Sequence, residues 1–400
     1  MVDSYAQTPL DAQRYQDLTP AQRQQRLREI TQVFLKLGTI AFGGPAAHVA
    51  MMDDEVVKRR GWMTREKLLD LLGVTSLIPG PSSTQLAIYI GYERAGFWGV
   101  VLAGTSFILP AMLMVWGLAA IYVRYQALPQ VNWLLYGIKP VIIAIVVQAL
   151  CKLGQKAVKD QWTAIATLSV IIAFALGVNE LLLLLLAGLG VTLLKNGERG
   201  GGGGKISMLM FPSVLAIAKS TVIASVSWVK VFFFFLKIGS VLYGGGYVLL
   251  AFLQRDLVER SHWLTSQQLL DAIAIGQVTP GPLFTTATFV GYLLAGNGGA
   301  IAGTLGIFLP SFILILVIGP WVAKLRSSAR ARGFLDGVNA ASVGLMAVVT
   351  YTLGRAAIID WLTITVALLS SIAIFRFGIN SIWLILAGGL VGIAVKVVGG

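Results

Sequence analysis

The chain has 400 residues, of which 56% are hydrophobic and only 12% are charged, and its formal net charge is +13. Soluble domains carry about 25% charged residues, so the composition excludes a soluble globular protein and predicts an all-α polytopic membrane protein. The basic excess is expected in loops, where it sets orientation and meets anionic headgroups. We therefore predict membrane lipid, and no nucleic acid, among the partners.

Residues that carry chemistry are few. Cys151 is the single cysteine and there are two histidines, so the sequence predicts no intramolecular disulfide and no metal site. It contains no Ser-His-Asp pattern, Walker loop or dinucleotide fingerprint. We therefore expect neither an enzyme nor a cofactor, and an ATP-driven pump would need a partner to supply its motor.

In chain order, residues 1–30 form a polar segment that lacks the apolar core of a signal peptide, with a short surface helix expected over 20–31. Residues 31–195 form a first repeat of apolar segments. "GGP" and "PGP" interrupt the first two segments, and the last two are near the lower length limit for a membrane span. The expected segments are 33–52, 66–93, 97–123, 133–151, 161–176 and 180–194.

The Pro-Gly-Pro sequence at 79–81 predicts a break in the helix. Proline removes an N–H and clashes with the preceding turn, and glycine adds backbone freedom. At membrane depth, freed backbone groups are tolerated only where they are buried in protein or line a wet cavity. We therefore expect the tip of a re-entrant hairpin inside the helix bundle. A proline kink within an ordinary span is the alternative.

The same unit occurs twice. Residues 34–81 align with 235–282 without a gap, as "FLKLGTIAFGGP" with "FLKIGSVLYGGG" and "LIPGP" with "VTPGP" show. Between the copies, "KNGERGGGGGKIS" is typical of a flexible linker. The predicted divisions are the polar segment 1–30, the repeats 31–195 and 231–396, and a Gly-rich linker with a lead-in helix at 196–230.

Loop charges orient the two repeats. If the Pro-Gly-Pro hairpin does not cross, most basic loop residues of the first repeat fall on one face, predicted to be cytoplasmic, whereas Arg124 and Lys139 fall on the other. The basic cluster at 324–332 reaches the cytoplasm only if the second repeat is upside down. About five spans per repeat, an odd number, produce such an inverted repeat. The arginines before residue 30 then lie outside, against the charge rule, so the side of the N-terminus is left open.

These motifs resemble those of the chromate ion transporter family. The resemblance is carried by "FGGPAAHVAMM" at 42–52, "GWMTREKLLDLLGVTSLIPGPSSTQLAIYIGY" at 61–92 and "SFILPAML" at 106–113, with "PGPLFTTATFVGY" and "GIFLPSF" in the second repeat. The family's long-chain members are two-domain membrane proteins, associated with export of chromate from the cytoplasm and with chromate resistance. The resemblance therefore implies a secondary transporter of the bacterial inner membrane.

Chromate is a tetrahedral dianion with oxygen acceptors only, so a site for it needs donors and positive potential, and helix N-termini offer both. For the hydroxyls of such a site, simple helix capping is the alternative; for the glycines, it is close helix packing; for the lysines, it is snorkelling to the membrane surface. The predicted substrate-binding residues are Lys36, Gly43, Gly44, Pro79, Gly80, Pro81, Ser82, Ser83, Thr84, Lys237, Gly244, Gly245, Pro280, Gly281, Pro282, Thr285 and Thr286.

Three residues are candidates for proton coupling. Asp70 and Asp271 lie in the apolar first arm of each hairpin, where a carboxylate could carry a proton, cap a helix or pair with a lysine. His48 belongs to the residue type that titrates near physiological pH. It has no counterpart in the second repeat, which favours a satisfied polar side chain.

The predicted mechanism is alternating access around an anion site near the membrane midplane, driven by the membrane potential or a proton gradient. Sulfate has nearly the same shape and charge as chromate, so a sulfate or other oxyanion carrier is an alternative, as is an anion channel. The sequence also leaves open the coupling ion and whether the chain forms a homodimer.

Overall fold

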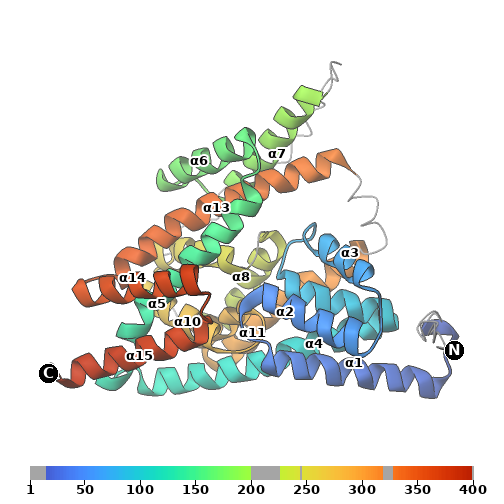
Figure 1. Cartoon of the computed structure of the whole chain (residues 1–400), viewed down its shortest axis with the longest axis horizontal. Coiled ribbons are helices and arrows are strands. Elements are labelled where there is room, and N and C mark those ends of the chain that lie inside the picture. The colour runs from blue at the N-terminus through green and yellow to red at the C-terminus, as the bar shows by residue number, and fades with distance from the viewer. Residues whose placement is uncertain (1–14, 200–225, 244–245, 319–327, 399–400) are drawn as a thin grey trace, which may run out of the picture.

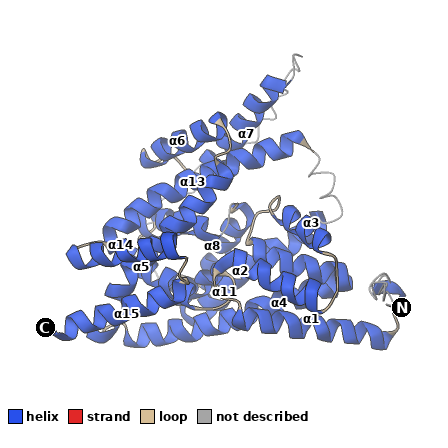
Figure 2. Cartoon of the chain, in the orientation of Figure 1, coloured by secondary structure: helices blue, strands red, loops and turns tan. Residues whose placement is uncertain are grey.

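The computed structural model describes residues 15–199, 226–243, 246–318 and 328–398. Within these ranges the chain is helical and contains no strand, as Figure 2 shows, so the all-α prediction is confirmed. The elements of the first repeat are η1 (Tyr15–Asp17), α1 (Pro20–Ile40), α2 (Gly44–Met52), the π-helix η2 (Asp53–Arg59), α3 (Arg65–Thr75), α4 (Ser82–Tyr125), α5 (Pro129–Ala157), α6 (Gln161–Ala175) and α7 (Glu180–Arg199).

The second repeat has its main helices in the same order, with short 3-10 turns at different places. They are α8 (Trp228–Val241), η3 (Gly246–Val248), α9 (Leu249–Phe252), the π-helix η4 (Leu253–Arg260), α10 (Ser266–Val278), η5 (Leu283–Thr285), α11 (Thr286–Ile318), α13 (Ala329–Ala357), α14 (Trp361–Phe377) and α15 (Ser381–Val398). Local signals fix several of these helix starts. Asp160 and Asp360, for example, form capping boxes with Thr163 and Thr363 at the starts of α6 and α14.

The predicted interruptions in the first repeat are present, but one predicted helix is longer. The helix expected over 20–31 begins as predicted, because Thr19 caps it and Pro20 occupies its first turn. It continues to Ile40, because apolar residues on one side of its second half are buried against the rest of the protein. The chain therefore crosses from the polar segment into the first repeat without a break at residue 30. Most of the predicted linker lies outside the described residues, with α7 continuing to Arg199 before it and α8 beginning at Trp228 after it.

α4 is not one straight helix but two helical arms joined by a sharp turn at Ala95 and Gly96, where Gly96 has a φ of 55°. The arms fold back on each other, since a Cβ on Gly91 would lie 2.2 Å from the Gly99 carbonyl oxygen. Small residues allow this backbone contact. α11 contains the same turn. The arm 82–94, about 20 Å long at 1.5 Å per residue, thus starts at the Pro-Gly-Pro loop and pairs with the longer arm after it.

The two Pro-Gly-Pro loops are each hydrogen-bonded to the other repeat. The Gly80 N–H donates to the Leu242 carbonyl oxygen at 2.8 Å, and the Gly281 N–H donates to the Ala41 carbonyl oxygen at 2.8 Å. Ala41 and Leu242 are the equivalent C-cap residues of α1 and α8. Equivalent atoms of the two repeats therefore make equivalent contacts, so the repeats are related by an approximate two-fold axis. These contacts place both helix breaks at the boundary between the repeats.

The long helices α5 and α13 each pack against helices of the other repeat. α5 of the first repeat packs against α14 and α15 of the second, whereas α13 of the second packs against α6 and α7 of the first. Figure 1 shows the green α6 and α7 beside the orange α13. Glycine permits the closest approach, because a Cβ on Gly137 of α5 would lie 1.9 Å from the Gly388 carbonyl oxygen of α15. The two repeats are thus interlocked.

We expect Gly137→Ala to lower the stability of the protein by about 1–3 kcal/mol, the usual cost of overpacking a close contact. The added methyl group would meet backbone atoms of α15, which cannot move away as a side chain can. The melting temperature of the detergent-solubilised protein measures this effect. Gly117→Ala is the control, because a Cβ on Gly117 would have no described atom within 4 Å. Equal melting temperatures for both variants would contradict the close α5–α15 contact.

Four helices in the described part of the chain are long and apolar enough to cross a membrane. They are Ser82–Tyr125, Pro129–Ala157, Leu283–Val317 and Arg330–Ala357. Because they fall at equivalent positions in the two repeats, the chain is a multi-pass membrane protein with a duplicated arrangement of spans. The count of five spans per repeat and the opposite insertion of the repeats stay predictions.

Candidate functional site

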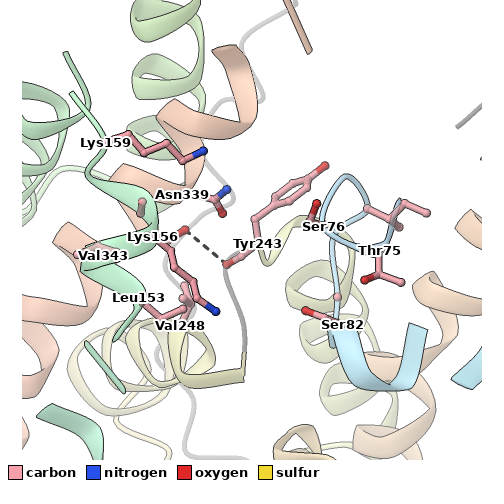
Figure 3. Close-up of a pocket in the computed structure, with 14 residues that line it drawn as sticks. Thr75, Ser76, Ser82, Leu153, Lys156, Lys159, Tyr243, Val248, Asn339 and Val343 are labelled. Carbon is pink, nitrogen blue, oxygen red and sulfur yellow. Dashed lines mark hydrogen bonds between the residues drawn. The ribbon is translucent and has the colours of Figure 1, made fainter. Parts of the chain in front are cut away.

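A polar cavity of about 340 Å³ lies beside the Pro-Gly-Pro loop of the first repeat. Its walls are the end of α3 with the start of α4, the end of α5, and the middle of α13, and Tyr243 after α8 also lines it. Figure 3 shows Lys156 and Lys159 across the cavity from Ser76 and Ser82. The cavity is therefore built by both repeats at one of the two helix breaks.

The charges around this cavity have a positive balance. Lys156 has no hydrogen-bond or ion-pair partner among the described residues. Lys159 Nζ lies 2.7 Å from Asp336 Oδ1, and Lys195 Nζ lies 2.8 Å from Asp336 Oδ2 and 2.7 Å from Asp160 Oδ2. This cluster thus has three ammonium groups and two carboxylates. Lys156 and Lys159 both line the cavity, and Lys156 is the one without a partner among the described residues.

Asp160 lies in the loop between α5 and α6. Burial alone would raise the pKa of its carboxyl group, but the hydrogen bonds from Lys195 and from the Thr163 N–H outweigh burial and hold that pKa below its usual value. The carboxylate is therefore ionised at neutral pH and forms an ion pair with Lys195. Lys156 is the cation that remains for an external anion.

The local sequence explains the other donors. α4 begins directly after Pro81, so its first N–H groups have no partner within the helix, and the positive end of its dipole faces the loop. The Ser82 hydroxyl is half-buried at this end and lines the cavity. Lys156 stands in the last turn of α5, where the helix dipole favours a cation. With the Asn339 side chain, these groups can hold an anion that has only oxygen acceptors.

Of the residues predicted at 79–84, Gly80 and Ser82 line the cavity and the others are buried. The Thr84 hydroxyl is fully buried and has no hydrogen-bond partner among the described residues. Gln85, which the prediction did not include, donates from Nε2 to the Pro79 carbonyl oxygen at 2.7 Å. Gln85 therefore supports the loop, and Thr84 is a buried hydroxyl that still lacks a partner.

The second Pro-Gly-Pro loop, residues 280–282, is equipped differently. The Thr285 hydroxyl donates to the Pro282 carbonyl oxygen at 2.9 Å, and the Thr286 hydroxyl donates to the Leu283 carbonyl oxygen at 2.8 Å. Both predicted hydroxyls are thus used within their own helical turns. The two loops do not offer the same donors, and the cavity lies beside the first.

Gly43 and Gly44 form the turn between α1 and α2 with φ values of 99° and 78°. Such positive φ values favour glycine, so the backbone conformation explains both residues, and neither lines the cavity. Their predicted counterparts Gly244 and Gly245 lie outside the described residues.

Lys36 and Lys237 form equivalent ion pairs. Lys36 Nζ lies 2.9 Å from Glu55 Oε2, and Lys237 Nζ lies 2.9 Å from Asp256 Oδ2, with both carboxylates on π-helical turns. The side chains of the two lysines are 46% and 41% exposed, and neither lines the cavity. Their recurrence therefore reflects a repeated ion pair, which neither anion attraction nor snorkelling predicted.

The candidates for proton coupling differ in their surroundings. Asp70 is exposed on α3, whereas Asp271 is buried on α10, where it accepts a hydrogen bond from the Tyr122 hydroxyl at 2.9 Å and lies 3.1 Å from Lys139 Nζ. His48 is buried, and its Nε2 lies 3.0 Å from a backbone carbonyl oxygen. Asp271 is thus the candidate carboxylate enclosed by partners from other helices.

Sequence reasoning missed one wall of the cavity. In the sequence, Lys156 and Lys159 look like loop charges that set orientation, and Tyr243 and Asn339 carry no signal of their own. The available signal was the run of lysines at the end of an apolar helix. Nothing local, however, indicates that this helix end meets the Pro-Gly-Pro loop.

Two interlocked repeats of membrane-spanning helices, with broken helices meeting at their boundary and a cationic cavity beside one break, match the construction of membrane transporters that are built from repeats. The chain belongs to the chromate transporter family, whose model matches residues 28–192 and 229–393. The family resemblance and the duplication are thereby confirmed.

Several relatives match most of the chain, and three of them carry names for chromate transport. It is 31% identical over 363 residues to a probable chromate transport protein of Synechococcus elongatus, covering 88% of this chain and 91% of that protein. It is 32% identical over 373 residues to the chromate transport protein of Cupriavidus metallidurans, covering 92% of each. It is 30% identical over 380 residues to the chromate transport protein of Pseudomonas aeruginosa, covering 90% of each. No solved structure matches the chain.

Proposed function

We propose that this protein exports chromate from the cytoplasm across the bacterial inner membrane. The family and the relatives named for chromate transport support the cargo. The observation that carries the proposal is the cavity beside the first Pro-Gly-Pro loop, where the Ser82 hydroxyl and the N-terminus of α4 meet the ammonium group of Lys156, which has no partner among the described residues. A tetrahedral dianion is bound by such a set of donors.

The proposed mechanism is alternating access by oppositely inserted repeats. The reciprocal hydrogen bonds of Gly80 and Gly281 support a two-fold relation between the helix breaks, and inverted-repeat transporters place their substrate at such a boundary. In this mechanism the repeats rock around the loops, and the anion passes from the cavity on one face to an exit on the other.

The membrane potential supplies the driving force in this proposal. Moving one charge across 100 mV is worth about 2.3 kcal/mol, so a dianion leaving an inside-negative cell gains about 4.6 kcal/mol. Export therefore needs no ATP. A proton gradient would add to this force, and Asp271 is the carboxylate we assign to proton transfer, because Asp70 is exposed and the His48 ring contacts a backbone carbonyl.

Everted membrane vesicles and proteoliposomes test this function. We expect vesicles that contain the protein to take up chromate when their interior is positive, and we expect chromate on the trans side to accelerate uptake, as in a carrier. Uptake without counterflow would indicate a channel. Sulfate that competes equally with chromate would indicate a general oxyanion carrier, and no uptake at all would refute transport of chromate.

A further inference from the structure

The hairpin arms α3 and α10 are equivalent in sequence but not in packing. Leu69 of α3 is 54% exposed, whereas its counterpart Leu270 of α10 is 0% exposed. The neighbouring Asp70 is exposed and Asp271 is buried. α10 packs against α5, α13 and α15, whereas α3 packs chiefly against α4 and η2. One arm is thus closed onto the long helices, and the cavity lies beside the arm that is not.

Two side chains of the closed arm, Gln267 and Asp271, contact a lysine of α5. Lys139 Nζ lies 3.1 Å from Asp271 Oδ1 and donates to Gln267 Oε1 at 2.6 Å, and the Tyr122 hydroxyl donates to Asp271 Oδ2 at 2.9 Å. α5 and α13 have 29 residues each, so Lys139 is the counterpart of Asn339, which lines the cavity. By the two-fold relation, an equivalent cavity beside the second Pro-Gly-Pro loop would have Lys139 in one wall. The carboxylate of Asp271 lies against that wall.

We propose that Lys139 and Tyr122 form a second binding station for the transported oxyanion, and that Asp271 occupies this station as a tethered anion in this structure. This inference rests on the proposed function. A carboxylate and a tetrahedral oxyanion present the same kind of acceptor to an ammonium group and a hydroxyl. If α10 moves away from α5, to a position like that of α3, Asp271 leaves Lys139 and Tyr122. The two side chains are then open to a soluble oxyanion beside the second Pro-Gly-Pro loop.

The burial of Lys139 makes this station attractive to an anion. Its side chain is only 15% exposed, and Lys139 from α5 and Tyr122 from α4 are the titratable groups that contact Asp271 in the described part of the chain. Removing one partner of a buried ion pair leaves an uncompensated charge, which is strongly unfavourable. Neutralising Asp271 therefore leaves the Lys139 ammonium group for a soluble oxyanion to satisfy, whereas Asp70 is exposed on α3 and its neutralisation changes nothing at Lys139.

Chromate binding to the purified full-length protein, measured by equilibrium dialysis in detergent, tests the inference. We expect wild type to bind a single chromate ion per chain and Asp271→Asn to bind a second one. Adding Lys139→Gln to Asp271→Asn should remove the second ion and keep the first. Asp70→Asn is the matched control and should bind as wild type does. Asp271→Ser provides a smaller neutral residue if the asparagine variant does not fold.

The outcomes separate this inference from the proposed function. If wild type binds chromate and the folded neutral variants bind no more than wild type, the second station is refuted while the cavity beside the first loop is retained. If the second ion survives the Lys139→Gln change, the station is not at Lys139. If wild type binds no chromate, the proposed function fails and the second station fails with it.

Discussion

Replacing Lys156 with alanine is expected to weaken chromate binding and chromate export by roughly 10- to 100-fold. Lys156 is the cation in the cavity that has no partner among the described residues. A hydrogen bond to a charged group is worth about 1.5–3 kcal/mol, and 1.4 kcal/mol corresponds to a factor of about 10 in affinity. Equilibrium dialysis gives the dissociation constant, and chromate accumulation in expressing cells gives export.

Lys152→Ala is the matched control for this charge. Lys152 is exposed on the same helix, one turn earlier, and does not line the cavity. Its removal should leave chromate affinity and export unchanged, at equal protein levels in the membrane. Lys156→Arg should retain most of the affinity, because the positive charge and the donors remain. Equal losses for Lys152→Ala and Lys156→Ala would show that only the overall charge of this face matters.

Gly80→Ala is expected to abolish export and to destabilise the protein more than any surface change. Gly80 has a φ of 129°, and a Cβ there would lie 2.4 Å from Ser311 Oγ and 2.7 Å from Gln85 Nε2. The unfavourable backbone conformation alone costs about 1–3 kcal/mol. The clash would also push the loop away from Leu242, to whose carbonyl oxygen the Gly80 N–H donates. Thermal unfolding and export assays measure the two effects separately.

Gly96→Ala separates backbone strain from the clash at the loop. Gly96 also has a positive φ, of 55°, but a Cβ there would meet nothing within 4 Å in the part of the chain that the structure describes. We expect this variant to lose some stability and to keep chromate export at matched membrane levels. If Gly80→Ala and Gly96→Ala behave alike, the contact between the Pro-Gly-Pro loop and the other repeat has no special importance for transport.

The sequence by itself determined the features that depend on neighbouring residues. The Pro-Gly-Pro breaks could be placed to within a few residues, because proline and glycine act on the backbone where they stand. The duplication was visible as an alignment, and composition alone required a membrane protein. The family followed from motifs in the same segments. Gly80 and Ser82 were selected because they adjoin a break, and both line the cavity.

Only the tertiary structure decided which segments meet. The letters "LLD" occur at equivalent positions of both hairpin arms, 68–70 and 269–271, yet Leu69 is exposed and Leu270 is buried. The recurrence of Lys36 and Lys237 left anion attraction and snorkelling open, and only the fold shows that each lysine is paired with a carboxylate. Lys156 lines the cavity because the end of α5 and the middle of α13 of the second repeat meet the first Pro-Gly-Pro loop there. Such contacts join residues far apart in the chain, and their free energy depends on the packing of whole helices, so no local pattern encodes them.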